Sequence, residues 1–339
     1  MEDPARHRLA ARPRASVSPQ ISAAGREPHS SAARLPPSAI TIRKAMSESE
    51  YAILRLGLCQ VETREWDEEG NLRRLLESLD EAGAQGAQLA ITPECVLHGY
   101  GMLAPGEDPR RLWEAAEPLD GPRIRAVAAQ ARRYEMDVVL GFAERGAQEG
   151  QVHNSAALIR RDGTILWVYR KVHCRSFELA GQPGGFTPGN EFHASTLPYA
   201  GDEFVIGAFI CFDREVTEAA RCLRALGAQI IACPLATNTF DIARSDGALR
   251  VDNEVVTRCR AAENEVFIAV VNHAGRFNGG SFVVGPMGEC LHRLGEGPET
   301  RVVDVPIGSA PEWFHAEPLG WMGWGYRRPD VYRKYLDKA

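Results

Sequence analysis

The chain has 339 residues, of which 44% are hydrophobic and 25% charged, so it can hold one large α/β domain or two average domains. Its formal net charge of −6 divides unevenly, because residues 1–46 hold eight Lys/Arg and three Asp/Glu, or +5, which leaves −11 for the remainder. A body this acidic argues against nucleic acid as a partner, and no apolar run reaches the length that spans a membrane.

Residues 1–46 differ in composition from everything that follows. They are rich in Arg, Ser, Ala and Pro and lack apolar periodicity, so we predict a disordered N-terminal extension. The Arg/Ser bias is compatible with an organellar targeting peptide, which the acidic residues Glu2, Asp3 and Glu27 weaken. Met46 as the real start of the chain is the alternative interpretation.

From Tyr51 onward, predicted strands and helices alternate. The first helix places Leu72, Leu75, Leu76 and Leu79 on one face, at the spacing typical of an amphipathic helix. The dipeptide Asp162-Gly163 separates two apolar runs and predicts a β-hairpin. The predicted strands of this half are 51–61, 87–92, 137–142 and the two arms of the hairpin within 155–171; the helices are 71–85 and 122–135, and 99–109 is a loop.

In the second half, predicted strands and helices alternate again after a loop-like region, 174–203. Its first helix, 214–226, should turn Val216, Ala219, Ala220, Leu223 and Leu226 inward. The predicted strands are 204–211, 229–233, 266–272, 281–285 and 301–305, and a second helix covers 247–264. Strands that alternate with helices, together with a hairpin, indicate packed α/β layers.

Two short segments echo each other. GAQLAITP (86–93) and GAQIIACP (227–234) match at an offset of 141 residues, each after an amphipathic helix. This offset is far longer than the period of a solenoid. Two related halves and a chance similarity are both open at this point.

Three polar residues end apolar strands and could form one catalytic site. Cys211 closes the run FVIGAFI, Glu94 follows LAITP, and Lys171 closes ILWVYR. A cysteine that leads directly into a helix, beside an ammonium group, is expected to favour the nucleophilic thiolate. A glutamate nearby can act as the base. The combination predicts a cysteine hydrolase.

The same residues resemble the nitrilase, or carbon–nitrogen hydrolase, superfamily. TPE (92–94), YRKVH (169–173) and ICFDRE (210–215) stand in the order of that family's Glu-Lys-Cys triad, and HNSAALIRRDG (153–163), RAAENEVFIAVVN (260–272) and GSFVVGPMG (280–288) agree with it. The resemblance covers residues 52–330. It implies a four-layer α-β-β-α sandwich, usually paired into dimers or larger assemblies.

The resemblance also implies roles for individual residues. Glu94 would be the base, Cys211 the nucleophile, and Lys171 with the backbone N–H of Phe212 the oxyanion donors. Glu178, seven residues past the lysine, matches a second glutamate that orients the lysine and the substrate amide in many relatives, with Glu191 as the competing candidate.

Arg214 could pair a substrate carboxylate, as the matching arginine does in relatives that act on N-carbamoyl amino acids. A structural ion pair with Asp213 or Glu218 is the alternative role. His98, His153 and His173 are expected to be structural. Most relatives have proline where this chain has Thr217. Because this position begins a helix, the difference should affect local geometry more than chemistry.

The leading interpretation is an amidase that cleaves a small linear amide and releases ammonia, because Cys-Phe-Asp resembles the amidase branches, whereas true nitrilases typically have Cys-Trp-Glu. The runner-up is an N-carbamoyl amidohydrolase, which releases carbon dioxide as well. A catalytically silent binding module on the same fold is a further alternative. A papain-like Cys-His enzyme is disfavoured by the surroundings of the cysteine.

The expected organisation has three parts: the extension 1–46, a hydrolase domain 47–310 and a C-terminal tail 311–339. The tail concentrates Trp313, Trp321, Trp324 and Tyr326, which suits packing at a subunit interface, so we predict at least a homodimer. The eight scattered cysteines form no CxxC pair, which is typical of a reducing, cytoplasmic setting and predicts no disulfides. Neither a metal nor a cofactor is expected, since the lysine already supplies a positive charge.

Overall fold

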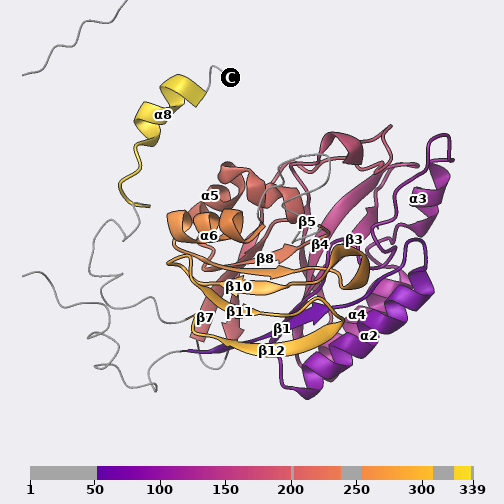
Figure 1. Cartoon of the computed structure of the whole chain (residues 1–339), viewed down its shortest axis with the longest axis horizontal. Helices are drawn as coiled ribbons and strands as arrows, with labels where there is room; N and C mark the ends of the chain where they lie inside the picture. Colours follow the sequence, from indigo (N-terminus) through magenta and orange to yellow (C-terminus); the bar gives the residue numbers. More distant parts are fainter. Residues whose placement is uncertain (1–51, 200–201, 238–252, 308–323, 337–339) are drawn as a thin grey trace, which may run out of the picture. The chain divides into compact units, whose positions relative to one another are not determined.

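The computed structural model describes residues 52–199, 202–237, 253–307 and 324–336. Two six-stranded sheets lie face to face, with helices on the outer side of each (Figure 1). In spatial order the first sheet consists of β12 (Glu299–Val305), β1 (Leu54–Gln60), β2 (Leu89–Ile91), β3 (Asp137–Arg145), β4 (Val152–Ile159) and β5 (Ile165–Arg170). The second consists of β11 (Cys290–Arg293), β10 (Phe282–Val284), β9 (Phe267–Val271), β8 (Ile230–Pro234), β7 (Asp202–Ala208) and β6 (Ala194–Tyr199).

The helices complete the four layers. The outer face of the first sheet packs on α2 and α4, and that of the second packs on α5 and α6 (Figure 1). The helix bounds are α2 (Glu68–Ala84), α3 (Arg110–Ala115), α4 (Pro122–Arg133), α5 (Thr217–Ala225), α6 (Asn253–Asn264) and α8 (Pro329–Leu336). This arrangement confirms the α-β-β-α sandwich that the family resemblance implies. Among the described helices, none is both long and apolar enough to span a bilayer.

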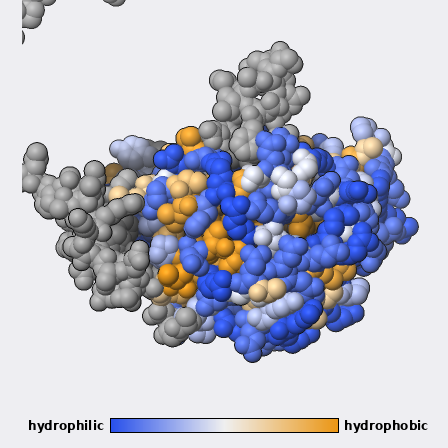
Figure 2. All heavy atoms as spheres, turned by 60° about the horizontal axis from the view of Figure 1, so that its bottom comes forward, coloured by the Kyte–Doolittle hydropathy of each residue, from blue (hydrophilic) through white to orange (hydrophobic). Residues whose placement is uncertain are grey.

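The apolar pattern of the sequence explains the layers. Leu75 and Leu79 are fully buried where α2 meets the first sheet, as their helical spacing predicts. Between the sheets, side chains such as Leu58 and Val139 pack in the same apolar cluster as Ile206 and Val270. The face that carries β12 and α2 is mainly hydrophilic, with apolar residues gathered in a few places (Figure 2).

The repeated segments occupy corresponding places in the two sheets. The first contains β2, which is parallel to both of its neighbours, β1 and β3. The second contains β8, which is likewise parallel to β7 and β9. Because β5 runs in the same direction as β2, and β7 in the same direction as β8, their carboxyl ends gather at one end of each sheet.

The structure corrects four expectations. The region 174–203 is not all loop, since it contains the edge strand β6, whose Pro198 breaks the usual strand pattern. The strand before Cys211 ends at Ala208, and a short 3-10 helix, η2 (Cys211–Glu215), separates it from α5. Leu226 lies just beyond α5 and is 53% exposed rather than buried. Three elements, β11, α3 and α8, were not anticipated.

The hairpin prediction is confirmed. Gly163 has φ +82°, and the carboxylate of Asp162 accepts a hydrogen bond from the backbone N–H of Thr164 at 2.9 Å. The predicted N-terminal extension, residues 247–252 of the predicted helix and residues 311–323 of the C-terminal tail lie outside the described residues.

Candidate active site

The three strand-end residues that the sequence singled out come together in one cluster, in which Glu94 and Lys171 are buried and Cys211 is partly buried. Glu94 follows β2, Lys171 follows β5 directly, and Cys211 follows β7. The ammonium nitrogen of Lys171 is 2.8 Å from Glu94 Oε1. The charges of both residues act on the pKa of Cys211, so the cysteine belongs to the same electrostatic environment. The convergence of strand ends from two different sheets therefore creates this site.

Lys171 is the centre of the charged cluster. Its side chain is 1% exposed, and Nζ donates to Glu94 Oε1 at 2.8 Å and to Glu178 Oε1 at 2.6 Å. Burial by itself would lower the pKa of Lys171, but the adjacent Glu94 carboxylate and other acidic groups raise it well above its ordinary value of 10.5. The lysine is therefore a permanent cation at neutral pH.

The structure selects Glu178, and not Glu191, as the second glutamate beside the lysine. Glu178 closes a 3-10 helix, η1 (Ser176–Glu178), and its carboxylate is fully buried. Oε1 also accepts from the Tyr100 hydroxyl at 2.8 Å, and Oε2 accepts from the backbone N–H of Arg175 at 2.7 Å. The side chain of Glu191, in contrast, is 72% exposed.

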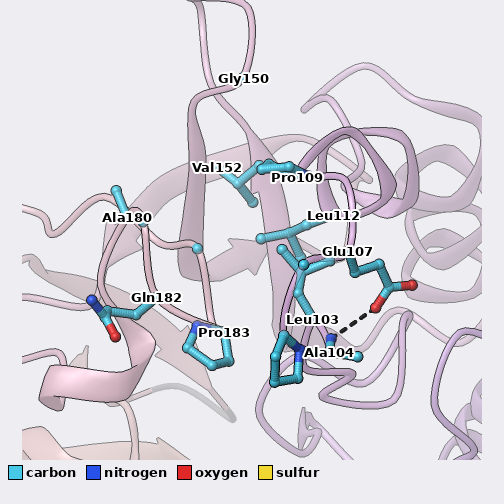
Figure 3. Close-up of a pocket in the computed structure, with 14 residues that line it drawn as sticks. Leu103, Ala104, Glu107, Pro109, Leu112, Gly150, Val152, Ala180, Gln182 and Pro183 are labelled. Carbon is cyan, nitrogen blue, oxygen red and sulfur yellow. Dashed lines mark hydrogen bonds between the residues drawn. The ribbon is translucent and has the colours of Figure 1, made fainter.

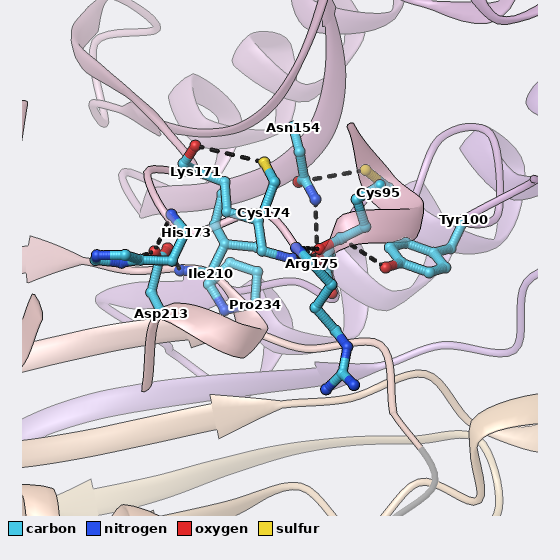
Figure 4. Close-up of polar contacts among 12 residues, drawn as sticks. Cys95, Tyr100, Asn154, Lys171, His173, Cys174, Arg175, Ile210, Asp213 and Pro234 are labelled. Atoms are coloured by element: carbon cyan, nitrogen blue, oxygen red, sulfur yellow. Dashed lines mark hydrogen bonds and ion pairs between the residues drawn. The ribbon is translucent and has the colours of Figure 1, made fainter. Parts of the chain in front are cut away.

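Glu94 is fully buried and unevenly paired. Its Oε1 atom accepts from Lys171 and, at 2.7 Å, from the amide nitrogen of Asn154, a side chain that also contacts Cys95 (Figure 4). Among the described residues, none donates a hydrogen bond to Oε2. Burial raises the pKa of this carboxyl above its ordinary value of 4.5, although the Lys171 charge opposes the shift. A carboxylate with a raised pKa is a stronger base than an exposed one.

Cys211 corrects one part of the sequence interpretation. It adopts a left-handed backbone conformation, φ 46°, which is uncommon for a residue with a side chain. The element that follows it is the short η2, so the sulfur does not lie at the start of an α-helix. Burial and the Glu94 carboxylate raise the pKa of Cys211 well above 9, although Lys171 acts in the opposite direction. The resting group is consequently a thiol and not the expected thiolate.

Asp213 fixes the loop that carries the cysteine. One carboxylate oxygen accepts from the Tyr169 hydroxyl at 2.7 Å and from the backbone N–H of Ile210 at 2.9 Å. The other contacts both the backbone N–H and Nδ1 of His173, each at 2.8 Å. Since Tyr169 and His173 flank the lysine in sequence, a single buried carboxylate holds the cysteine loop and the lysine segment together.

Phe212 and Arg214 lie on either side of that aspartate in sequence. The guanidinium of Arg175 stacks over the Phe212 ring at 4.9 Å from its centroid. Arg214 has a fully buried side chain, and its carbonyl oxygen accepts from Arg260 Nε at 3.0 Å. The positive charge of Arg214 acts on Cys211, so it belongs to the surroundings of the cysteine.

The three histidines that the sequence marked as structural have structural surroundings. His153 pairs through Nδ1 with the carbonyl oxygen of Thr187 at 2.7 Å, and His173 pairs with Asp213. His98 is buried, and burial lowers its pKa to about 4, so it is neutral at pH 7. Among the described residues, no group of His, Cys, Asp or Glu side chains is arranged to hold a metal ion.

Sequence reasoning missed Asn154, Tyr100 and His273, and it considered Asp213 only as a partner of Arg214. Asn154, Tyr100 and His273 contact one of the two glutamates, and Asp213 holds the cysteine loop. Asn154 stands within one of the supporting stretches that carried the family resemblance, and His273 directly follows another. Their positions in or beside these stretches could have marked both residues as candidates. The sequence could not show that each contacts Glu94, because Glu94 lies 60 residues from Asn154 and 179 residues from His273 along the chain.

A pocket of about 260 Å³ lies beside the loop that carries Glu178 (Figure 3). It is formed by segments 103–112 and 180–185 together with Gly150 and Val152. Its one carboxylate, Glu107, accepts from the backbone N–H of Ala104 at 2.8 Å and pairs with Arg111. The pocket therefore lies between two of the loops that the sequence left without motifs.

The chain was compared with known proteins. A profile of the carbon-nitrogen hydrolase family matches residues 55–314. A Pseudomonas (R)-stereoselective amidase is 31% identical over 75% of this chain and 85% of its own length, and the deaminated glutathione amidase of Homo sapiens is 28% identical over 85% and 86%. The crystal structure of an amidase from Nesterenkonia sp. matches at TM-score 0.63 with 27% identity, over 84% of this chain and 96% of that one.

A further structure of the Nesterenkonia amidase adds a chemical observation. It is a mutant with the acetamide moiety of fluoroacetamide covalently added at the active-site cysteine, and it matches with 26% identity at TM-score 0.63, over 84% of this chain and 97% of that one. The profile match, the relatives and the shared fold agree on the family of this chain. The chain belongs to the carbon–nitrogen hydrolase family, within the amidases of the nitrilase superfamily.

Proposed function

We propose that the protein hydrolyses a small linear amide through a thioester on Cys211 and releases ammonia. The observation that carries this proposal is the pairing of the permanently charged Lys171 with Glu94 beside a neutral cysteine thiol. In the Nesterenkonia amidase mutant the active-site cysteine carries a covalent adduct, which supports a nucleophilic cysteine in this chain as well.

The first half of the reaction forms the thioester. Glu94 takes the thiol proton of Cys211, and the sulfur attacks the amide carbonyl carbon as the π electrons move to oxygen. Lys171 Nζ and the backbone N–H of Phe212 stabilise the resulting oxyanion. When the oxyanion collapses, the carbon–nitrogen bond breaks, and the protonated Glu94 gives its proton to the departing nitrogen, which leaves as ammonia.

The second half restores the enzyme. Glu94, again a carboxylate, removes a proton from water, and the resulting hydroxide attacks the thioester carbonyl. Collapse of this second oxyanion breaks the carbon–sulfur bond, and the sulfur takes the proton back from Glu94. One amide and one water thus become one carboxylic acid and one ammonia.

Two further residues receive roles in this proposal. Glu178 fixes Lys171 through its 2.6 Å contact and, by analogy with the family, orients the substrate amide. Arg214, buried near the cysteine, is proposed to pair with a carboxylate of the substrate. That second role favours the alternative function, hydrolysis of an N-carbamoyl amino acid or amine. The intact cluster argues against a catalytically silent binding module.

Removal of the nucleophile tests the thioester. Cys211→Ala should lower turnover by about 10³-fold or more while the protein still folds, because only one sulfur atom is lost. Wild-type protein that is quenched in acid during turnover of an amide panel should carry an acyl adduct in its intact mass. Cys211→Ala treated in the same way is the control and should stay unmodified. Turnover of Cys211→Ala within tenfold of the wild type would refute the assignment.

The released products separate the two hydrolase functions. An amidase should release ammonia alone, whereas an N-carbamoyl hydrolase should release ammonia and carbon dioxide in equal amounts. Both products can be assayed in one reaction, with nitriles as control substrates that should remain intact. Stoichiometric carbon dioxide, together with loss of activity in Arg214→Ala, would establish the alternative, and efficient nitrile hydrolysis would contradict both.

Close packing of Gly141 against the backbone around Glu94 constrains the position of this glutamate. Gly141 of β3 lies against the Glu94 loop, where a Cβ atom would be 2.3 Å from the carbonyl oxygen of Pro93 and 3.0 Å from Glu94 Cα. The same glycine donates to Thr92 Oγ1 at 3.0 Å and accepts from the N–H of Val96 at 2.9 Å. Since the obstructing atoms belong to the backbone, they cannot rotate away.

Gly141→Ala should therefore shift Glu94 and lower kcat by about 10–100-fold, because displacements near 1 Å have effects of this size. The loss of unfolding free energy should be about 1–3 kcal/mol, the usual cost of overpacking. Gly295→Ala is the matched control, since a Cβ atom there meets nothing within 4 Å. Kinetics and urea unfolding measure both effects. Equal activity of the two variants would contradict this account of the glycine.

Assembly and location complete the proposal. We infer a homodimer or larger homo-oligomer, in which the aromatic tail 311–339 packs on a partner subunit. The proposed location is the cytoplasm. The extension 1–46 and the hydrolase domain 47–310 are the other two proposed parts of the chain. Light scattering of the purified chain should give at least twice the monomer mass, and truncation after Pro311 should lower it. A full-length monomer with full activity would contradict the assembly.

A further inference from the structure

The side chain of Glu94 presents its two oxygens to different surroundings. Oε1 accepts two hydrogen bonds, at 2.8 Å from Lys171 and 2.7 Å from Asn154, whereas Oε2 is buried and receives no hydrogen bond from any residue that the structure describes. A buried carboxylate oxygen without a donor is costly unless a reacting group uses it. Oε2 is therefore the oxygen available to exchange protons with the cysteine, the leaving nitrogen and water.

Asn154 is bound to the cluster at both ends. Its Nδ2 atom donates to Glu94, and its Oδ1 atom accepts a weak hydrogen bond from Cys95 Sγ at 3.4 Å. Its backbone carbonyl oxygen accepts from the N–H of Lys171 at 2.8 Å. The amide thus has one orientation, with NH₂ toward the carboxylate, because the reverse orientation would place oxygen against oxygen. One residue of β4 contacts both the proposed base and the proposed cation.

His273 contacts the backbone of Glu94. This residue follows β9 in the second sheet, and its Nε2 atom lies 2.7 Å from the backbone carbonyl oxygen of Glu94, in the first sheet. Its Nδ1 atom lies 2.7 Å from the Thr63 hydroxyl. Burial lowers the pKa of His273 to about 3, so the ring is neutral at pH 7. A carbonyl oxygen only accepts, so Nε2 carries the proton and Thr63 donates to Nδ1.

We propose that Asn154 and His273 are positioning residues that fix Glu94, from its side chain and from its backbone respectively, so that Oε2 faces the reacting atoms. The Asn154 amide donates to Oε1 of Glu94, so that Oε2 remains available for proton transfer. His273 sets the distance of the Glu94 backbone from the second sheet, which carries Cys211. The proposal rests on the proposed function, in which Glu94 is the base.

The first test removes the amide donor. Asn154→Leu keeps nearly the same volume, and it should lower kcat by about 30–100-fold with little change in KM, because the base is misoriented but the substrate still binds. The acid limb of the kcat/KM profile should move to higher pH, because loss of a donor to the charged carboxylate raises the pKa of Glu94. If Asn154→Leu does not fold, Asn154→Ser has the same expected direction.

Ser155→Ala is the matched control for this variant. Ser155 is the next residue of β4, is fully buried and donates to a buried carboxylate outside the site, Glu144, at 2.6 Å. Loss of the Ser155 hydroxyl in Ser155→Ala should lower Tm but leave the acid limb of the kcat/KM profile at the same pH. An unshifted acid limb in Asn154→Leu, with an activity loss no greater than that of Ser155→Ala, would overturn the assignment of Asn154.

The second test uses rescue at His273. His273→Leu removes the donor to the Glu94 carbonyl and should lower kcat by about 10–100-fold. His273→Gln places an amide N–H near the position of Nε2 and should recover at least tenfold of that loss. Equal activity of the Leu and Gln variants would overturn the positioning role. Glu94→Gln separates this outcome from failure of the proposed function, because wild-type turnover in that variant would refute the base itself.

Discussion

One buried ammonium group, that of Lys171, makes the rest of the site possible. It contacts Glu94 and Glu178 at 2.8 and 2.6 Å, and neither carboxylate is exposed. Two buried negative charges without this cation would carry a large desolvation cost, and breaking such a pair costs about 3–5 kcal/mol. With all three groups charged the cluster has a net charge of −1, which disfavours a second anion on Cys211. The cysteine accordingly rests as a thiol, and the proposed reaction therefore begins with removal of its proton.

The fold supplies this cluster from two sheets. Glu94 and Lys171 come from strand ends of the first sheet, and Cys211 comes from the second. Such a site requires that the sheets stay in register across the apolar layer between them. Two polar links near the cluster do this: Asp213 joins the cysteine loop to the lysine segment, and His273 joins the second sheet to the Glu94 backbone. The apolar layer stabilises the sandwich, and these links fix the positions of the cysteine loop, the lysine segment and the Glu94 backbone relative to one another.

The catalytic cluster and the surrounding loops differ in how tightly they are constrained. Glycines let backbones approach both glutamates closely, Gly141 beside Glu94 and Gly184 beside Glu178, where a Cβ atom would be 2.5 Å from the Cα of Glu178. The loops that line the neighbouring pocket, in contrast, include exposed Ala, Gly and Gln residues. The charged cluster is thus closely packed, whereas the loops beside the pocket are more exposed, which is where loop-borne substrate specificity is commonly found.

The order and spacing of three strand-end motifs were sufficient to identify the fold, the family and the grouping of Glu94, Lys171 and Cys211, because each strand signal is local and the motifs are specific. The choice of Glu178 over Glu191 required the structure. The sequence also located most strands and helices, but it missed β6 with its internal proline and the 3-10 turn after the cysteine. The protonation of the cysteine was predicted wrongly, since burial and neighbouring carboxylates outweigh the lysine. Only the tertiary structure could assign Asn154 and His273 to Glu94, because hydrogen bonds between residues 60 and 179 positions apart depend on how the sheets pack.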